Sequence, residues 1–122
     1  MLDTLEFDNR FTRELPADPE TENFRRQVSG ACYSRVHPTH VESPELVAYS
    51  REMADELGIS ESDINSAEFR EVFGGNRLVE GMDPFAMCYG GHQFGNWAAQ
   101  LGDGRAINLG ETLNKEGRRW VL

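Results

Sequence analysis

The segment YGGHQFGNWAAQLGDGRAINLGE, residues 89–111, contains six glycines among twenty-three residues. Glycine loses more conformational freedom on folding than any other residue, so such a dense cluster needs a structural or functional reason. Within the segment, NWAAQL suits a short strand, GDGR suits a tight turn, and AINLGE has the two-residue alternation of a returning strand. We therefore expect an antiparallel hairpin whose turn is GDGR.

The sequence after this hairpin continues the sheet. NKEG, residues 114–117, is typical of a second turn, and RRWVL begins a third strand. The large aromatic side chains of Phe94, Trp97 and Trp120 are expected in the core. Lys115 is the only lysine of the chain, and its place in the turn predicts that it points to solvent.

The GDGR turn has the composition of a phosphate-binding loop. Gly102 and Gly104 would let backbone N–H groups approach phosphate oxygens, and Arg105 could form a bidentate contact to a phosphate. The spacing completes neither common motif: no lysine follows Gly95 as a Walker A loop requires, and Ile107 stands where G-x-G-x-x-G has its third glycine. From the residues alone, a purely structural turn with a solvated arginine remains an alternative.

Two helical segments precede the glycine-rich region. SPELVAYSREMADELG predicts a helix with Ser43 as N-cap and Pro44 at the first helical position, ended by Gly58. A shorter helix is expected from about Ser60 or Ser66, ended by two glycines at positions 74 and 75. Both helices are interpreted as structural.

The chain as a whole predicts one incomplete α+β domain, residues 1–122. Residues 1–42 are expected to form an irregular wrap with short extended pieces, of the kind that covers a larger body. Residues 43–75 form the helical part, and residues 76–122 form the glycine-rich loop and antiparallel strands.

Composition excludes several classes of partner and site. The formal net charge of −9 argues against a nucleic-acid-binding or anionic-membrane surface. No apolar run is long enough for a membrane span, and no signal peptide is seen, so a cytoplasmic location is expected. Cys32 and Cys88 are interpreted as ordinary thiols. His37 and His40 with Cys32 lack a convincing fourth ligand, so no metal site is assigned.

Longer stretches of this sequence resemble a known family. Four stretches are similar to the N-terminal part of the selenoprotein O family: FDNRFTRELPADPE, GACYSRVHPTHV, ELVAYSREMADELG and the glycine-rich segment 89–111. The combination of GGHQFG, QLGDGR and LGE is highly specific to that family. The resemblance extends from Phe7 to the last residue, Leu122.

The resemblance implies a protein-kinase-like fold and a nucleotidyltransferase. Family members transfer AMP from ATP, bound in a flipped orientation, to Ser, Thr or Tyr hydroxyls of target proteins, with Mg²⁺ or Mn²⁺. Gly102, Gly104 and Arg105 match the family's nucleotide loop. The nucleotide-binding lysine and the catalytic and metal-binding residues are expected beyond Leu122.

The length of the chain limits what the resemblance implies. The 122 residues are expected to be a fragment that is poorly stable and inactive alone. Two alternatives stay open: a non-catalytic fragment that packs against a partner, and a variant that transfers UMP.

Overall fold

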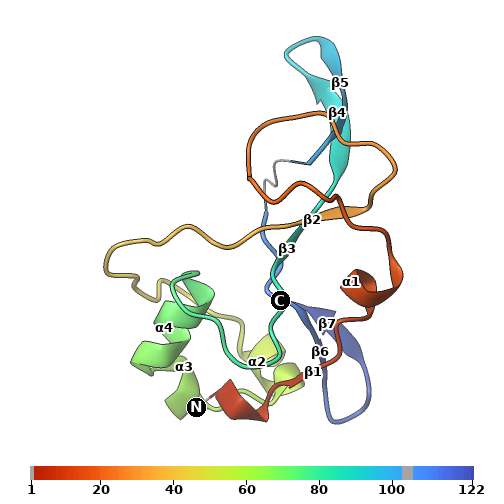
Figure 1. Ribbon diagram of the computed structural model, residues 1–122. Coiled ribbons are helices and arrows are strands. Elements are labelled where there is room, and N and C mark those ends of the chain that lie inside the picture. The colour runs from red at the N-terminus through yellow and green to blue at the C-terminus, as the bar shows by residue number, and fades with distance from the viewer. Residues whose placement is uncertain (1, 103–105) are drawn as a thin grey trace.

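The computed structural model describes residues 2–102 and 106–122, in which small antiparallel sheets lie beside a group of short helices (Figure 1). The mixed composition agrees with the expected α+β class. The strands form one three-stranded sheet in the order β1-β6-β7 and two two-stranded sheets, β2-β3 and β4-β5. Their bounds are β1 Glu6–Phe7, β2 Tyr33–Arg35, β3 Phe85–Met87, β4 Tyr89–Gln93, β5 Asn96–Leu101, β6 Glu111–Leu113 and β7 Arg119–Val121.

The described helices are short, and serines begin three of them. Ser50, Ser60 and Ser66 each accept a hydrogen bond of 3.1 Å from the backbone N–H three residues ahead, which satisfies one free donor of the first turn. The expected starts at Ser60 and Ser66 are thus both used, by two separate helices. The helices are η1 Leu2–Thr4, α1 Arg10–Glu14, α2 Arg51–Leu57, α3 Glu61–Ile64 and α4 Ala67–Phe73.

The prediction of a helix that begins at Ser43 is wrong for the first half of that segment. Ser43 has a φ of 47°, outside helical geometry, and residues 44–50 are not helical. Ser50 caps the helix instead, and Glu52 follows in its first turn. The expected end is confirmed, because Gly58 adopts the left-handed conformation with a φ of 70°.

Helices α2, α3 and α4 pack with the start of the chain into the main apolar core. The residues at its centre are less than 10% exposed and come from η1, the helices and the link between them. Residues from the last strand region and from the loop before β3 complete it. The buried members are Leu2, Leu5, Ala54, Ile59, Ile64 and Val72; Phe7, Leu46, Leu57, Phe69, Val79, Met82 and Leu122 pack against them.

A second, aromatic core lies under β2 and β3. Tyr33 and Phe85 are each 1% exposed, and their ring centroids are 5.7 Å apart in an edge-to-face arrangement. Phe11 of α1 stacks on Phe85 at 5.1 Å. The Tyr33 hydroxyl donates to the carbonyl of Thr12 at 2.6 Å, so α1 is tied to the sheet. The sequence did not predict α1.

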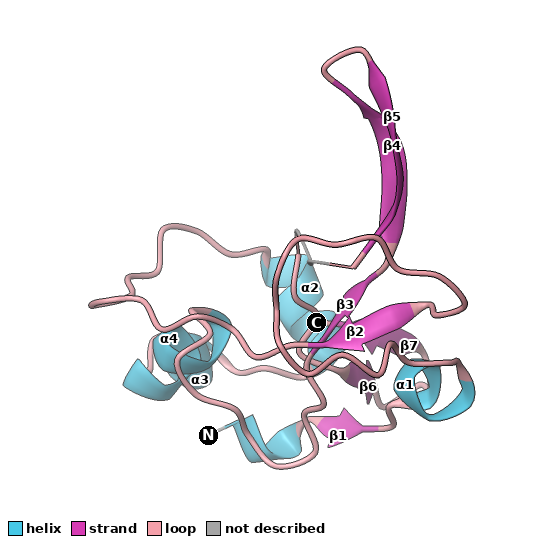
Figure 2. Ribbon diagram, turned by 45° about the horizontal axis from the view of Figure 1, so that its top comes forward, coloured by secondary structure: helices cyan, strands magenta, loops and turns pink. Residues whose placement is uncertain are grey.

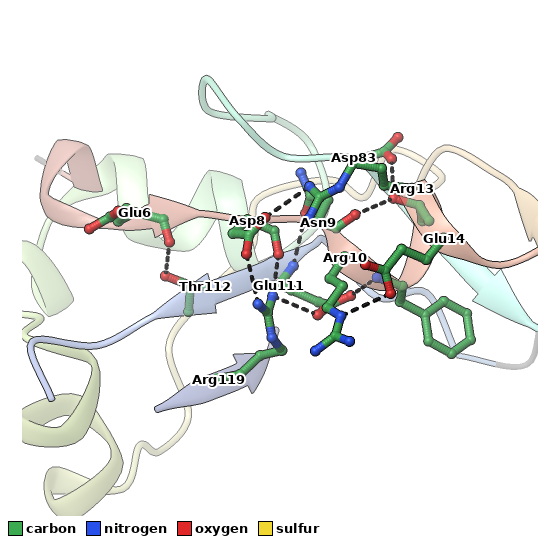
Figure 3. Close-up of polar contacts among 12 residues, drawn as sticks. Glu6, Asp8, Asn9, Arg10, Arg13, Glu14, Asp83, Glu111, Thr112 and Arg119 are labelled. Carbon is green, nitrogen blue, oxygen red and sulfur yellow. Dashed lines mark hydrogen bonds and ion pairs between the residues drawn. The ribbon is translucent and has the colours of Figure 1, made fainter. Parts of the chain in front are cut away.

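The N-terminal segment is joined to the far end of the chain by a polar network (Figure 3). Strand β1 pairs antiparallel with β6, and the Thr112 hydroxyl donates to the Glu6 carbonyl at 2.8 Å. Arg119 of β7 forms ion pairs with Asp8 at 2.7 Å and with Glu111 at 3.0 Å. Glu111 is 3% exposed and also accepts the backbone N–H of Phe11. The N-terminal segment is therefore fixed through buried and partly exposed contacts.

Strands β4 and β5 form a hairpin that projects from the rest of the molecule (Figure 2). Its two-residue turn is Phe94–Gly95, and both residues have positive φ, 50° and 79°. Turns of this kind match the twist of paired strands. The expected pairing of NWAAQL with AINLGE is wrong, because β5 pairs with β4 through this closer turn. Phe94 and Trp97, 102% and 63% exposed, also lie outside the core in which they were expected.

The remaining elements of the C-terminal region are those predicted from the sequence. Strand β7 pairs with β6 across the NKEG turn, in which the Gly117 N–H donates to the Asn114 carbonyl at 2.9 Å. Lys115 is exposed in this turn, as expected. None of the helices in residues 2–102 and 106–122 combines the length and the apolar character that a membrane span requires.

Candidate nucleotide-binding site

The expected nucleotide loop begins where β5 ends. Gly102 follows the last residue of β5, and both Leu101 and Gly102 are buried. The other two candidates, Gly104 and Arg105, lie outside the described residues. The structure therefore positions the first of the three candidates and the residues that flank the loop on either side.

Gly102 is a glycine because its surroundings leave no room for a side chain. A Cβ built on Gly102 would lie 2.2 Å from Val28 Cγ2 and 3.1 Å from the Ser34 hydroxyl oxygen. Carbon atoms in van der Waals contact are about 3.5–4.0 Å apart, so the first contact is a severe overlap. Two residues more than 60 positions upstream in sequence thus confine the start of the loop.

Residues 26–34 pair with the end of β5 and fix its direction. The Val28 N–H donates to the Gln100 carbonyl at 2.9 Å, and Gln27 forms an antiparallel bridge with Leu101. The Gln100 side-chain amide donates to the Ala31 carbonyl at 2.6 Å. Figure 1 shows this segment passing around the base of the β4-β5 hairpin. We call residues 26–34 the clamp segment.

An ion pair and a hydroxyl hold the clamp segment in place. Arg26 pairs with Asp18, and their side chains are only 11% and 10% exposed. The Ser34 hydroxyl donates to Asp18 Oδ2 at 3.1 Å, and Arg26 Nη2 lies 3.3 Å from the same hydroxyl. The two opposite charges neutralise each other, as a buried pair requires. The same hydroxyl faces Gly102, so this cluster supports the start of the loop directly.

The far side of the loop is also anchored. Asn108 and Phe85 exchange two backbone hydrogen bonds, of 2.8 and 2.9 Å, which tie the chain after the loop to β3. The Leu109 N–H then donates to the Leu122 carbonyl at 2.7 Å. The segment between Gly102 and Asn108 is therefore bounded by two fixed positions, the arrangement that a preorganised binding loop needs.

The ionisation of Asp18 makes the stability of the clamp segment depend on pH. Burial is the largest influence on the pKa of Asp18 and by itself would raise it. Hydrogen bonds from Arg26, the Glu20 N–H and Ser34, together with the charge of Arg26, outweigh burial. They lower the pKa of Asp18 below its ordinary value of 3.8. A carboxyl with a lowered pKa in the folded state stabilises that state above its unfolded pKa. This contribution is lost as the pH falls through the folded value.

We therefore expect the variant Asp18→Asn to be less stable than the wild type at pH 7 and to approach it in stability below about pH 4. Urea unfolding at pH 7 and at several values between pH 5 and pH 2.5 measures the difference. Asp3→Asn, a change at an exposed aspartate of η1, is the matched control and should alter stability by less than about 0.5 kcal/mol. A constant difference between Asp18→Asn and wild type at all pH values would contradict this role.

The described residues provide no metal centre. Among residues 2–102 and 106–122, no three His, Cys, Asp or Glu side chains gather closely enough to hold an ion. His37 and His40 are both exposed and contribute to no such group. No described residue is therefore assigned as a ligand for Mg²⁺ or Mn²⁺.

The sequence predicts Gly102 as a candidate but does not predict the residues that position it. These residues are Asp18, Arg26, Val28 and Ser34, and they belong to residues 1–42, for which the sequence predicts an irregular wrap with short extended pieces. An alternating or helical pattern is the signal that identifies a core face, and residues 18–30 show neither. The contacts depend on residues distant in sequence, so no local motif could have revealed them.

Comparison with known proteins identifies relatives that are much longer than this chain. A "Protein nucleotidyltransferase YdiU" from Azoarcus sp. (strain BH72) is 70% identical over 118 residues, which are 97% of this chain and 23% of the relative. Proteins of the same name from Methylobacillus flagellatus and Rhodopirellula baltica are 62% and 61% identical. These alignments cover 97% of this chain and 23% and 22% of the respective relatives. The chain thus spans about a quarter of the length of its relatives.

The family comparison covers the clamp segment, the hairpin and both flanks of the loop. The model of the family described as "Protein adenylyltransferase SelO" matches residues 19–122, most of the chain. This match, together with the high identity to the YdiU proteins, confirms the resemblance stated from the sequence. The chain belongs to the SelO protein adenylyltransferase family.

Proposed function

We propose that this chain forms the nucleotide-binding N-terminal part of an enzyme that transfers AMP from ATP to Ser, Thr or Tyr hydroxyls of target proteins. The observation that carries the proposal is the packing of Gly102, which has no space for a Cβ and starts a glycine- and arginine-containing loop between two anchored ends. The printed names of the relatives, protein nucleotidyltransferase, support the same class of reaction. The proposed architecture is the N-terminal part of a protein-kinase-like fold.

In this proposal the loop holds the phosphates of ATP. Backbone N–H groups near Gly102 and Gly104 donate to phosphate oxygens, and the guanidinium of Arg105 adds a bidentate, charge-assisted contact. Such fixed donors stabilise the charge that develops on the phosphate during transfer. The local positive charge also offsets the net charge of −9 of the chain.

A divalent metal, Mg²⁺ or Mn²⁺, would neutralise phosphate charge when bound. The described residues supply no ligand set, so the proposal places the ligands and the catalytic residues outside this chain. The 122 residues alone are accordingly expected to be inactive. We further propose that they form one incomplete domain, with a wrap at 1–42, helices at 43–75 and the loop region at 76–122, and that the enzyme works in the cytoplasm, where ATP and protein substrates are available.

The variant Arg105→Ala tests the loop assignment in the full-length protein. We expect ATP to bind at least about tenfold more weakly, because a charge-assisted contact to phosphate contributes about 1.5–3 kcal/mol. The unfolding free energy should change by less than about 0.5 kcal/mol. Isothermal titration with ATP and urea unfolding provide the two measurements, and Arg10→Ala, at an exposed arginine of α1, is the matched control.

The alternatives predict different results in the same assay. A non-catalytic fragment that only packs against a partner would keep its affinity for ATP, or its lack of affinity, in Arg105→Ala. A UMP-transferring enzyme would label its protein substrate from UTP in preference to ATP. Competition between labelled ATP and UTP, with Mg²⁺ and with Mn²⁺, therefore decides the nucleotide.

A further inference from the structure

The two cysteines of the chain lie opposite each other across neighbouring strands. In the β2-β3 ladder Tyr33 is paired with Met87 and Ser34 with Ala86, so one further step of the same register pairs Cys32 with Cys88. The Cys88 N–H donates to the Cys32 carbonyl at 2.9 Å, which confirms that the two backbones are still in contact at this step. They are 56 positions apart in sequence and adjacent in space.

This placement suits a disulfide bond. Directly opposed residues of antiparallel strands have Cα atoms about 4.5–5.5 Å apart and side chains on the same face. Disulfides are made between Cα atoms about 4.4–6.8 Å apart. No large backbone movement is therefore needed to join the two sulfur atoms.

Both thiols are also accessible to a small reagent. Cys32 and Cys88 are each partly exposed and are present as free thiols. They line the same surface hollow of about 480 Å³, together with Tyr89, Trp97 and Gln100 of the hairpin. An oxidant that enters this hollow lies next to both cysteines.

We propose that Cys32 and Cys88 form a reversible redox pair, oxidised to an intramolecular disulfide by a peroxide. One thiol releases its proton and attacks a peroxide oxygen; the S–O bond forms, the O–O bond breaks, and the departing hydroxide is protonated to water. The second thiol attacks the resulting sulfenic sulfur; the S–S bond forms, the S–O bond breaks, and a second water leaves with the released proton. Two thiols lose two electrons, and one hydrogen peroxide accepts them.

The disulfide would act on the clamp segment. Cys32 belongs to this segment, which pairs with the end of β5, and Cys88 directly precedes β4. Oxidation would therefore join the clamp segment covalently to the strand that enters the hairpin. Any effect on nucleotide affinity rests on the function proposed above, whereas the thiol chemistry does not.

The test is peptide mapping of the protein at its natural length after treatment with hydrogen peroxide. Cleavage after arginine places Cys32 in the peptide 27–35 and Cys88 in the peptide 78–105. We expect these two peptides to be recovered as one linked species, 2 Da lighter than their sum, and to separate after reduction with dithiothreitol. This readout is independent of any other cysteine and of enzymatic activity.

Three variants control the geometry. Cys32→Ser and Cys88→Ser should each abolish the linked species. The double variant Met87→Cys/Cys88→Ser keeps two thiols but moves one to the next residue, whose side chain lies on the opposite face of the strand. It should link at least tenfold less under the same conditions, with folding checked by circular dichroism.

Two results would overturn the proposal. One is wild-type protein in which peroxide produces only sulfinic or sulfonic acid, or leaves both thiols unmodified. The other is a double variant that links as readily as wild type, because the linkage would then not depend on the register of β2 and β3. Linkage of wild type with no change in ATP affinity would retain the redox pair and remove only its effect on the nucleotide.

Discussion

Replacing Gly102 with alanine is expected to lower the unfolding free energy by about 1–3 kcal/mol, the range for forcing extra carbon atoms into a packed site. The new Cβ would lie 2.2 Å from Val28 Cγ2, so the Val28 side chain, β5 or the clamp segment must move. Gly102 is not among the glycines with positive φ, so the cost is steric and not torsional. Urea unfolding measures the loss, and ATP titration of the full-length protein should show weaker binding because the loop start is displaced.

A substitution at Val28 tests whether its Cγ2 atom causes the loss of stability in Gly102→Ala. Val28→Ala removes Cγ2, and the closest remaining contact of the new Cβ in Gly102→Ala would be 3.1 Å, to the Ser34 hydroxyl. We therefore expect the two changes to be non-additive, with the double variant recovering about 1 kcal/mol relative to the sum of the single losses.

Gly91→Ala is the matched control for Gly102→Ala. Gly91 lies in β4 of the same hairpin, but a Cβ there meets no atom within 4 Å. It should change stability by less than about 0.5 kcal/mol. Equal stabilities of Gly102→Ala and Gly91→Ala would show that the clamp segment does not confine the start of the loop.

Replacing Glu111 with alanine is expected to lower the unfolding free energy by about 1–3 kcal/mol, the range for removing one partner of a buried hydrogen bond. Glu111 is 3% exposed, pairs with Arg119 at 3.0 Å, and accepts the Phe11 N–H at the start of α1 (Figure 3). Its loss leaves the partly buried Phe11 N–H without this acceptor and removes the link between β6 and α1. Thermal and urea unfolding measure the change.

Two further variants separate charge from hydrogen bonding. Glu111→Gln keeps an oxygen that can accept from Phe11 but loses the charge, so it should cost less than Glu111→Ala. Glu14→Ala breaks only the exposed pair with Arg10, whose side chain is 61% exposed, and should cost less than about 0.5 kcal/mol. If Glu111→Ala is no more damaging than Glu14→Ala, the N-terminal segment is held by other contacts.

Local signals in the sequence predicted the parts of the fold that local chemistry controls. Ser60 and Ser66 begin helices because a serine hydroxyl satisfies a free N–H of the first turn, and Gly58 ends one because it adopts positive φ. The NKEG turn and the strand after it are likewise defined within a few residues.

Contacts between distant residues explain what the sequence did not predict. Nothing near residues 6–7 indicates that β1 pairs with β6, and the half-buried Leu46 joins the core from a non-helical segment. The hairpin partner of β5 was missed because Phe94 is an unusual residue for positive φ, whereas Asn or Gly would have marked the turn.

The candidate site also combines a residue that the sequence predicts with contacts between distant residues that it does not. Glycine spacing and family resemblance identified Gly102, and the packing of Val28 gives the physical reason for a glycine there. The ion pair of Asp18 with Arg26 could not be predicted, because the two partners are eight positions apart in irregular chain and only the folded clamp segment brings them together.

The pairing of β1 with β6 has a consequence for synthesis on the ribosome. The bond between Thr112 and Glu6 joins residues 106 positions apart, so β1 leaves the ribosome long before its partner exists. At about 5–20 residues per second, this wait lasts on the order of 5–20 s. During that time the first strand has an open edge and the apolar side chain of Phe7 lacks its final neighbours. The nascent chain is therefore expected to depend on chaperone protection until the last strands emerge.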